Sequence, residues 1–382
     1  MNRGGLLMVA GEASGDLHGA RLLAELRPLV PDLEVFGLGG RELAALGQEQ
    51  IADVSEISVI GIAEAAKIVP RAKRILDEIA TACERRRPAA AVLIDFPEFN
   101  LRLARRLKWL GIPVIYYISP QVWAWRRGRV RVIGELVDLM LVLFGFEAAF
   151  YREHGVEAVH VGHPLVDEVP RLRGAWDAEP KAQPLGEIRV ALLPGSRKGE
   201  IEELLPRMIG AIRLLRARHS EHRISPRLIL SPGLPESFVR DRLQGEAIEI
   251  VAERRFEAIA DSHLAFCASG TATLEVGLLG TPMIVLYRLH PWSHLLAKLL
   301  VKLPSFSLVN LVLGRRAVPE LLQDEARPER VADEAWRLAS SSERIRDQRR
   351  SLAELRPALG SAGASRRAAI EVAGRLNRER AA

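Results

Sequence analysis

Short apolar runs alternate with amphipathic segments along the N-terminal half of the chain. The apolar runs predict buried strands at Leu6–Ala10, Glu34–Gly37, Ala89–Ile94, Pro113–Ile118, Leu136–Phe144 and Ala158–Val161. Between them, apolar residues at helical spacing predict helices at Leu17–Leu29, Arg71–Arg86 and Leu101–Leu110. Apolar strands that alternate with helices are typical of a parallel sheet covered by helices on both faces.

The alternation stops at residues 169–187, which are rich in proline and glycine and predict a linker. Beyond it, strands are predicted at Arg189–Leu193, Arg227–Ser231, Glu249–Ala252, Leu264–Ala268 and Pro282–Tyr287, and helices at Ile201–Arg218 and Thr271–Leu279. We therefore predict an α/β protein with two Rossmann-like, doubly wound domains, residues 1–168 and 188–340, that face a ligand-binding cleft. The arginine-rich residues 341–382 predict a helical tail that packs on the N-terminal domain or on a partner subunit.

Composition excludes several classes of protein. The chain has 382 residues, of which 48% are hydrophobic and 27% charged, so it is globular rather than disordered. It lacks an uncharged apolar run of ~18 residues and the apolar core of a secretion signal, so we expect a cytoplasmic protein without a membrane span. Two distant cysteines, Cys83 and Cys267, exclude a disulfide framework and a cysteine zinc site.

The net charge of +6 fits an anionic substrate, an anionic membrane or nucleic acid. Nucleic acid is disfavoured because no basic stretch is interleaved with aromatic residues. Two apolar stretches with basic neighbours, Ile57–Val69 and Pro291–Pro304, predict reversible binding to an anionic membrane surface. The alternative is that both are ordinary helices that face the core.

Polar residues follow predicted strands of the first domain, where ligands bind in open parallel sheets. Glu12, Ser14 and Asp16 follow the first strand and offer oxygen atoms to a carbohydrate, although Ser14 or Asp16 could instead cap a helix. Their acidity and the absence of G-x-G-x-x-G argue against a phosphate there. Asp95 follows another strand directly and is well placed to act as a general base, whereas Asn100 could brace the turn.

A third strand ends in the aromatic motif Tyr116–Arg126, in a chain with only 5% aromatic residues. Packing alone could account for one of these rings, but polar groups beside aromatic faces suit a sugar or an amphiphilic ligand. The candidate contacts are Ser119, Gln121 and Trp123.

Two loops of the second domain predict an anion site. Ser196 and Arg197 precede one helix, and the run from Ser269 through Gly270 to Thr271 opens another, so backbone N–H groups and a guanidinium are available to a nucleotide diphosphate. Glu275 interrupts an apolar helix and could accept a hydrogen bond from a ribose hydroxyl, or be an ordinary helix residue. Metal-binding and Walker motifs are absent, so we expect neither a metal nor a cofactor.

Seven motifs together resemble the lipid-A-disaccharide synthase family, in order over roughly the first 325 residues. They are GEASGD (11–16), DFPEFN (95–100), YYISPQVWAWR (116–126), GHPL (162–165), LLPGSR (192–197), ASGTATLE (268–275) and PELLQ (319–323). The resemblance implies a B-type glycosyltransferase fold. It also implies inverting transfer from UDP-2,3-diacylglucosamine to 2,3-diacylglucosamine 1-phosphate, which yields a β-1,6-linked disaccharide and UDP. The expected location is the cytoplasmic face of the inner membrane, and the resemblance is compatible with a homodimer.

The resemblance also assigns roles. It makes Asp95 the base for the acceptor 6-hydroxyl, places Arg197 and Ser269–Thr271 at the diphosphate and Glu275 at the ribose, and gives Asn310 a supporting role. Two positions depart from the family, because Gly145 and Val309 stand where proline is usual, which relaxes both turns. The alternatives are another UDP-N-acetylglucosamine-type transferase or epimerase, and a non-catalytic lipid- or sugar-binding module.

Overall fold

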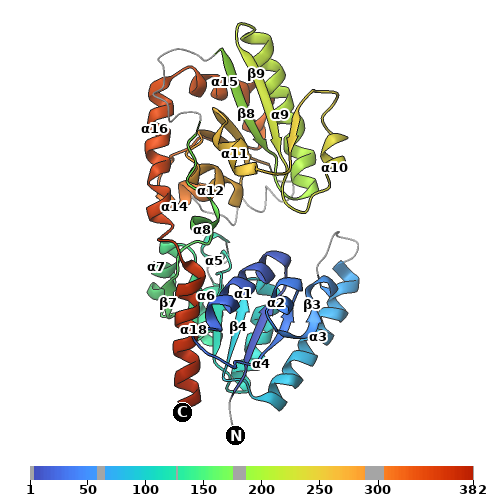
Figure 1. Ribbon diagram of the computed structural model, residues 1–382, viewed down its shortest axis with the longest axis vertical. Helices are drawn as coiled ribbons and strands as arrows, with labels where there is room; N and C mark the ends of the chain where they lie inside the picture. The colour runs from blue at the N-terminus through green and yellow to red at the C-terminus, as the bar shows by residue number, and fades with distance from the viewer. Residues whose placement is uncertain (1–3, 58–64, 126–127, 175–185, 289–304, 382) are drawn as a thin grey trace. The chain divides into compact units, whose positions relative to one another are not determined.

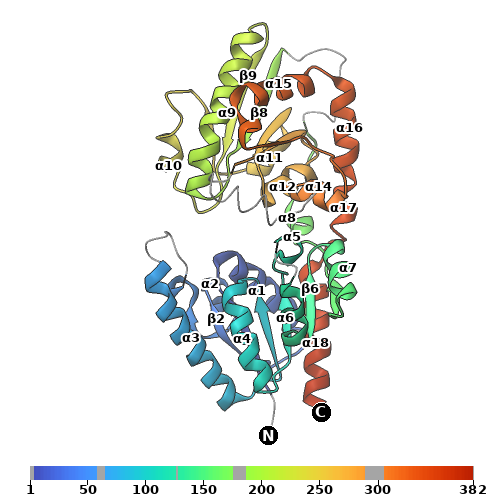
Figure 2. The same cartoon turned by 180° about the vertical axis from the view of Figure 1, so that it is seen from behind.

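The computed structural model describes residues 4–57, 65–125, 128–174, 186–288 and 305–381. The chain divides into two compact units (Figures 1 and 2). The first unit comprises Met1–Pro164 and Gly360–Ala382, and the second comprises Leu165–Leu359. Each unit has its own parallel sheet with helices packed on it, which confirms the predicted α/β class. The cleft expected between two domains stays a prediction.

The first unit is built on a seven-stranded parallel sheet with the order β3-β2-β1-β4-β5-β6-β7. Its strands are β1 Leu6–Ala10, β2 Val35–Gly39, β3 Glu49–Asp53, β4 Ala90–Ile94, β5 Val114–Tyr117, β6 Leu139–Val142 and β7 Ala158–His160. The order reverses between β1 and β4, whose last residues, Ala10 and Ile94, are paired. Ligands bind at such a reversal in open α/β sheets.

Helices cover this sheet on both faces. They are α1 Ala13–Leu26, α2 Arg41–Ala45, α3 Ala65–Arg86, α4 Pro97–Trp109, α5 Val122–Trp125, α6 Arg129–Leu136, α7 Gly145–Glu153 and α18 Ala364–Ala381. The C-terminal helix α18 packs against α1 and β4 (Figure 1). Arg367 fastens it by donating from Nε to the Val161 carbonyl at 2.8 Å.

The second unit has a six-stranded parallel sheet with the order β10-β9-β8-β11-β12-β13. Its strands are β8 Glu187–Leu193, β9 Arg223–Ile229, β10 Glu249–Val251, β11 Leu264–Ala268, β12 Met283–Tyr287 and β13 Glu320–Leu322. Its described helices are α8 Leu165–Glu168, α9 Lys198–Arg218, α10 Glu236–Arg240, α11 Arg255–Ala260, α12 Thr271–Leu278, α14 Leu308–Leu313, α15 Pro328–Ala339, α16 Ser342–Ala353 and α17 Leu355–Ala358. Here the order reverses between β8 and β11.

Some helices begin earlier than their apolar pattern predicts. Helix α1 begins at Ala13 rather than Leu17, and α4 begins at Pro97 rather than Leu101. Their first turns carry polar residues next to the strand ends, so hydrophobic periodicity does not mark them. The expected tail at 341–382 is divided, since α16 and α17 belong to the second unit and α18 to the first.

Candidate functional site

The reversal point of the first sheet brings two acidic residues together. Asp95 follows β4, and Glu12 follows β1 at the N-cap of α1. Asp95 and Phe96 have φ angles of 46° and 48°, a left-handed conformation that costs free energy in residues other than glycine. Gly11 permits this turn, because a Cβ atom at that position would lie 2.1 Å from the Phe96 ring.

Hydrogen bonds hold the Asp95 backbone in this strained conformation. Its carbonyl accepts from the Tyr116 hydroxyl at 2.5 Å and from Asn100 Nδ2 at 2.7 Å, and its N–H donates to the Tyr117 carbonyl at 3.0 Å. Asn100 is fully buried and also donates to the Ile94 carbonyl at 3.1 Å. Asn100 therefore braces the turn and helps to fix the backbone of Asp95.

The surroundings of the Asp95 carboxyl make it a stronger base than an ordinary aspartate. Burial raises its pKa to about 6, and the negative charge of Glu12 adds to this shift. A hydrogen bond from the Phe96 N–H acts in the opposite direction and is the smaller effect. A carboxylate with a pKa near neutrality is ionised at pH 7 and retains a useful proton affinity, which suits general-base catalysis.

Asp16 is occupied by structural contacts. Its carboxylate accepts hydrogen bonds from the backbone N–H groups of Gly40, Glu42 and Leu43, at 2.7, 2.9 and 3.2 Å. Asp16 thus caps α2 instead of its own helix, and it is buried. Ser14, in the first turn of α1, is exposed and stays available to a ligand, as Glu12 does.

The aromatic motif after β5 divides into buried and exposed positions. Ser119 is buried, and its hydroxyl lies 2.9 Å from the hydroxyl of Tyr151. Trp123 is also buried, and its indole Nε1 donates to Glu147 Oε1 at 3.0 Å. Gln121 is exposed. The sequence analysis gave Glu147 no role, although a glutamate in a mostly apolar segment was the signal that could have drawn attention to it.

The reversal point of the second sheet brings the two glycine-containing loops together. Gly195 has φ +115°, and Arg197, at the N-cap of α9, has a side chain that is 84% exposed. The nearest acidic contact of Arg197 is Glu200 Oε1, at 3.4 Å. Two residues after β11, Gly270 is the N-cap of α12, so the positive end of that helix dipole lies beside it. The pair of loops therefore presents positive charge at the β8–β11 junction.

Ser269 and Thr271 differ in their availability. The Ser269 hydroxyl donates to the Phe306 carbonyl at 2.8 Å, which ties the start of α12 to the segment after residue 304. Thr271 and Ser196 are exposed. Ser269 therefore supports the loop, whereas Ser196 and Thr271 can reach a ligand.

Glu275 is buried in α12 beside a cation. Its Oε2 pairs with Arg255 Nη1 at 2.9 Å, and this ion pair offsets the free energy cost of burying a carboxylate in an apolar helix. Burial nevertheless raises its pKa, and Arg255 lowers it. Because Arg255 bonds Oε2, Oε1 is the oxygen that suits a ribose hydroxyl.

Asn310 belongs to a buried polar network. Its Nδ2 donates to Glu320 Oε1 at 2.8 Å, and its Oδ1 accepts from the N–H groups of Ala317 and Val318. Glu320 also accepts from the hydroxyl of Ser307, at 2.7 Å. The network ties the start of α14 to β13. Sequence reasoning did not assign Glu320, although it lies in the PELLQ motif.

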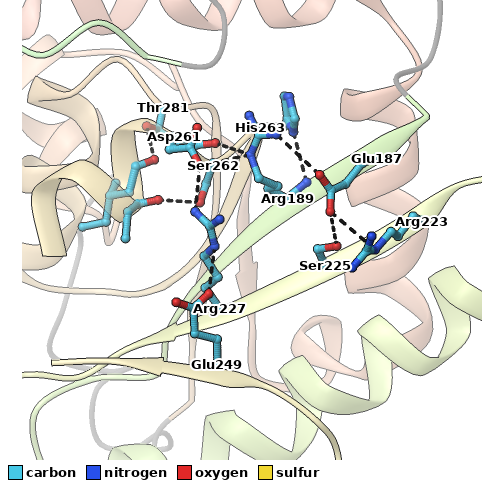
Figure 3. Close-up of polar contacts among 12 residues, drawn as sticks. Glu187, Arg189, Arg223, Ser225, Arg227, Glu249, Asp261, Ser262, His263 and Thr281 are labelled. Carbon is cyan, nitrogen blue, oxygen red and sulfur yellow. Dashed lines mark hydrogen bonds and ion pairs between the residues drawn. The ribbon is translucent and has the colours of Figure 1, made fainter. Parts of the chain in front are cut away.

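A second charged network lies at the opposite, amino end of the same sheet (Figure 3). Arg227 and Arg189 both pair with Asp261 Oδ2, at 2.7 and 3.2 Å. The backbone N–H of Arg189 donates to His263 Nδ1 at 3.0 Å, and burial lowers the pKa of His263 to about 4. These residues bond one another across the starts of β8, β9 and β11, so we assign this network to stability.

In the described ranges, no group of three or more histidine, cysteine, aspartate or glutamate side chains is placed to hold a metal ion. Among the helices of those ranges, none is long and apolar enough to cross a bilayer. Pro291–Pro304 and most of Ile57–Val69, the predicted membrane-binding stretches, lie outside the described residues.

Comparison with known sequences decides the family. Residues 6–372 match the lipid-A-disaccharide synthetase family. The chain belongs to this family. It is 45% identical to the lipid-A-disaccharide synthase of Myxococcus xanthus (strain DK1622) over 373 residues, which cover 96% of each chain. It is 43% identical to the enzyme of the same name from Anaeromyxobacter dehalogenans (strain 2CP-1 / ATCC BAA-258) over 372 residues, or 97% of each chain.

Solved structures with little sequence similarity share the fold. The calicheamicin glycosyltransferase CalG4 has a TM-score of 0.59 at 16% identity and covers 99% of both chains. The UDP-N-acetylglucosamine 2-epimerase of Neisseria meningitidis, bound to UDP-N-acetylglucosamine, has a TM-score of 0.58 at 12% identity and covers 90% of this chain and 94% of its own. As a lipid-A-disaccharide synthetase family member, the chain is a disaccharide-forming glycosyltransferase that acts on lipid-linked sugars.

Proposed function

We propose that the chain joins UDP-2,3-diacylglucosamine to 2,3-diacylglucosamine 1-phosphate and releases the β-1,6-linked disaccharide 1-phosphate and UDP. Membership of the lipid-A-disaccharide synthetase family supports this reaction. The structural observation that carries it is Asp95, a carboxylate on a braced turn, with a pKa raised to about 6, at the reversal point of the first sheet.

In this mechanism Asp95 acts on the acceptor. Its carboxylate accepts the proton of the 6-hydroxyl while that oxygen forms a bond to C1 of the donor sugar. The bond between C1 and the diphosphate oxygen breaks in the same step, and UDP leaves with the electron pair. The attack occurs opposite the leaving group, so the configuration at C1 inverts. General-base assistance of this kind contributes about 10²–10⁴-fold to a rate.

The second unit stabilises the leaving group. Negative charge grows on the diphosphate as the bond to C1 breaks, and fixed positive groups favour that state. Arg197 and the N-terminus of α12 at Gly270 and Thr271 supply them, and Ser196 adds a hydroxyl. Glu275 holds the ribose through Oε1. The network of Asn310 holds Phe306, whose carbonyl accepts from Ser269 at the start of α12.

The acceptor contacts come from exposed residues of the first unit. Glu12, Ser14 and Gln121 are exposed and offer polar groups to a sugar. The other expected acceptor residues are less available, so we give them supporting roles. Asp16, Ser119 and Trp123 hold their polar side-chain atoms in internal hydrogen bonds, and Asn100 is fully buried with its Nδ2 bonded to the Asp95 carbonyl.

A direct assay tests the proposed reaction. Purified protein is incubated with both substrates, and the disaccharide 1-phosphate is detected by mass spectrometry, with each substrate omitted in turn as controls. The account predicts product only when both are present. Folded protein that forms no disaccharide, or that releases UDP without acceptor at the same rate, would contradict it.

We further propose that the protein binds an anionic membrane surface peripherally at the inner membrane, where its acylated substrates reside. Val69, at the edge of one apolar stretch, is 64% exposed next to the basic residues Arg71, Lys73 and Arg74. Basic residues near an anionic surface contribute about 1 kcal/mol each, and salt weakens this attraction. We expect the protein to co-sediment with anionic vesicles at low salt but not with neutral ones. Protein that stays in the supernatant with anionic as well as neutral vesicles would refute this proposal.

A further inference from the structure

A buried carboxylate lies behind the loop that follows β5. Glu147, the third residue of α7, is 2% exposed. Its Oε1 accepts from Trp123 Nε1 at 3.0 Å, its Oε2 accepts from the Phe144 N–H at 3.3 Å, and the Ser119 hydroxyl also bonds to it. One carboxylate therefore joins both ends of the Ser119–Trp123 loop to the start of α7. Figure 1 shows α5 and α7 at the same end of the first unit.

This loop is continuous with the backbone that holds Asp95. The carbonyl of Tyr117 accepts from the Asp95 N–H, and Tyr116 donates its hydroxyl to the Asp95 carbonyl. Between Tyr117 and Ser119 lies Ile118, with φ +67°, a conformation rarely adopted by a β-branched residue. Such a conformation persists only where contacts on both sides enforce it. If the loop were released, Ile118 could relax and the turn at Asp95 would shift.

Aromatic packing continues the same support. The Trp123 and Phe146 rings meet edge to face with centroids 4.9 Å apart, and Phe146 stacks on Phe144 at 5.4 Å. Two residues of α7 therefore hold Trp123: Glu147 accepts its N–H, and Phe146 packs against its ring.

We propose that Glu147 is a positioning residue for the transfer reaction: its carboxylate fixes the Ser119–Trp123 loop and, through Tyr117, the catalytic carboxylate of Asp95. Glu147 does not touch the substrate in this arrangement. The proposal rests on the proposed role of Asp95 as the base. It adds a residue whose charge state controls the geometry of that base.

The charge of Glu147 matters because donors face both of its oxygens. An ionised carboxylate accepts from Trp123 and Phe144 together, whereas a protonated one turns one oxygen into a donor and leaves two donors opposed. Burial raises the pKa of Glu147 to about 7, so both forms occur near neutral pH. Burial and the Glu147 charge raise the pKa of Tyr151 on α7. Burial, His18 and His160 lower the pKa of His163, which follows β7.

Glu147→Gln tests this role with little change of shape. The amide places an NH₂ group where one oxygen faces an N–H donor, so the variant imitates the protonated carboxyl at every pH. We expect kcat to fall by roughly tenfold to a hundredfold, the scale of a misplaced catalytic group. Wild-type activity should fall in two steps as the pH is lowered, near 7 and near 6, and the step near 7 should be missing in the variant. UDP affinity, a property of the second unit, should not change.

Glu153→Gln is the matched control, since Glu153 is exposed on the same helix. It should keep the wild-type rate and pH profile. A Glu147→Gln protein with wild-type kcat, or with the step near pH 7 intact, overturns the proposal. Should that variant fail to fold, Trp123→Phe removes the donated N–H together with part of the indole ring, and full activity in it would overturn the proposal equally. A wild-type protein without transferase activity contradicts the proposed function instead.

Discussion

At the scale of single residues, the two carboxylates at the β1–β4 junction differ in environment. Asp95 is half-buried, and Glu12 is exposed at the start of α1. Burial makes the larger contribution to the raised pKa of Asp95, and the Glu12 charge adds to it. The arrangement resembles other acid pairs in which one group tunes the other. In the proposed mechanism the half-buried member is the base, and the exposed member both tunes it and contacts the acceptor.

Glu12→Gln should therefore move the pH dependence of the reaction. Without the Glu12 charge the pKa of Asp95 falls below about 6, so the ionised base persists to lower pH. The acid limb of log(kcat/KM) against pH should shift to lower pH, while KM for the acceptor rises. Glu25→Gln, a glutamate on the far turns of α1, serves as the control. An acid limb that stays in place would separate Glu12 from the electrostatics of Asp95.

Arg197→Ala should weaken UDP binding. The guanidinium is exposed at the β8–β11 junction and is the charged side chain best placed for a diphosphate. A hydrogen bond to a charged group contributes about 1.5–3 kcal/mol, so the free energy of UDP binding measured by calorimetry should weaken by that amount. Arg254→Ala removes another exposed arginine of the second unit as a control. Equal affinity in wild type and Arg197→Ala would place the diphosphate elsewhere.

At the scale of elements, the junctions between strands and helices carry the candidate chemistry. Helix α4 begins directly after the left-handed Phe96, and α12 directly after Gly270. At α7 the family's usual proline is replaced by Gly145, yet the helix still begins there. A Cβ at Gly145 would meet nothing closer than His160 Nδ1, at 3.7 Å. Glycine in place of proline at position 145 therefore leaves the start of α7, which carries Glu147, intact.

Gly145→Pro should consequently stabilise the first unit. Position 145 is the first residue of α7, where proline is favoured and no intrahelical N–H bond is lost. Phe144, at φ −118° and ψ 137°, already has the conformation that precedes proline. We expect about 0.4–1 kcal/mol more free energy of unfolding in urea titrations. Gly111→Pro, at φ +68°, should destabilise instead; a destabilised Gly145→Pro protein would refute this description of α7.

The sequence predicted the central elements better than their edges. Apolar runs located β1, β4 and β11 because these strands are buried throughout. The half-exposed β3 lacks that signal and was not predicted. Motif reasoning found Asp95 and Arg197 at the reversal points, but could not show that Asp16 caps α2 across 24 to 27 positions of sequence. Such long-range hydrogen bonds depend on packing, which local patterns do not encode.

At the scale of the whole molecule, the proposed mechanism divides the reaction between two sheets. In it, the first unit supplies the base and the acceptor contacts, and the second supplies positive charge for the leaving group. Both sites occupy the position where strand order reverses, as the rule for open α/β sheets expects. Helix α18, the last element of the chain, closes the first unit by packing on α1 and β4.

The proposed mechanism makes Asp95 the base and gives it no part in holding UDP, and Asp95→Asn separates these two functions. Because the pKa of Asp95 is raised in the folded state, its ionisation lowers stability as the pH rises from about 4 through about 6. The variant should therefore melt no lower than wild type at pH 7.5. We predict turnover reduced by about two orders of magnitude or more, with calorimetric UDP affinity unchanged. A folded Asp95→Asn protein with near-normal turnover would contradict the account.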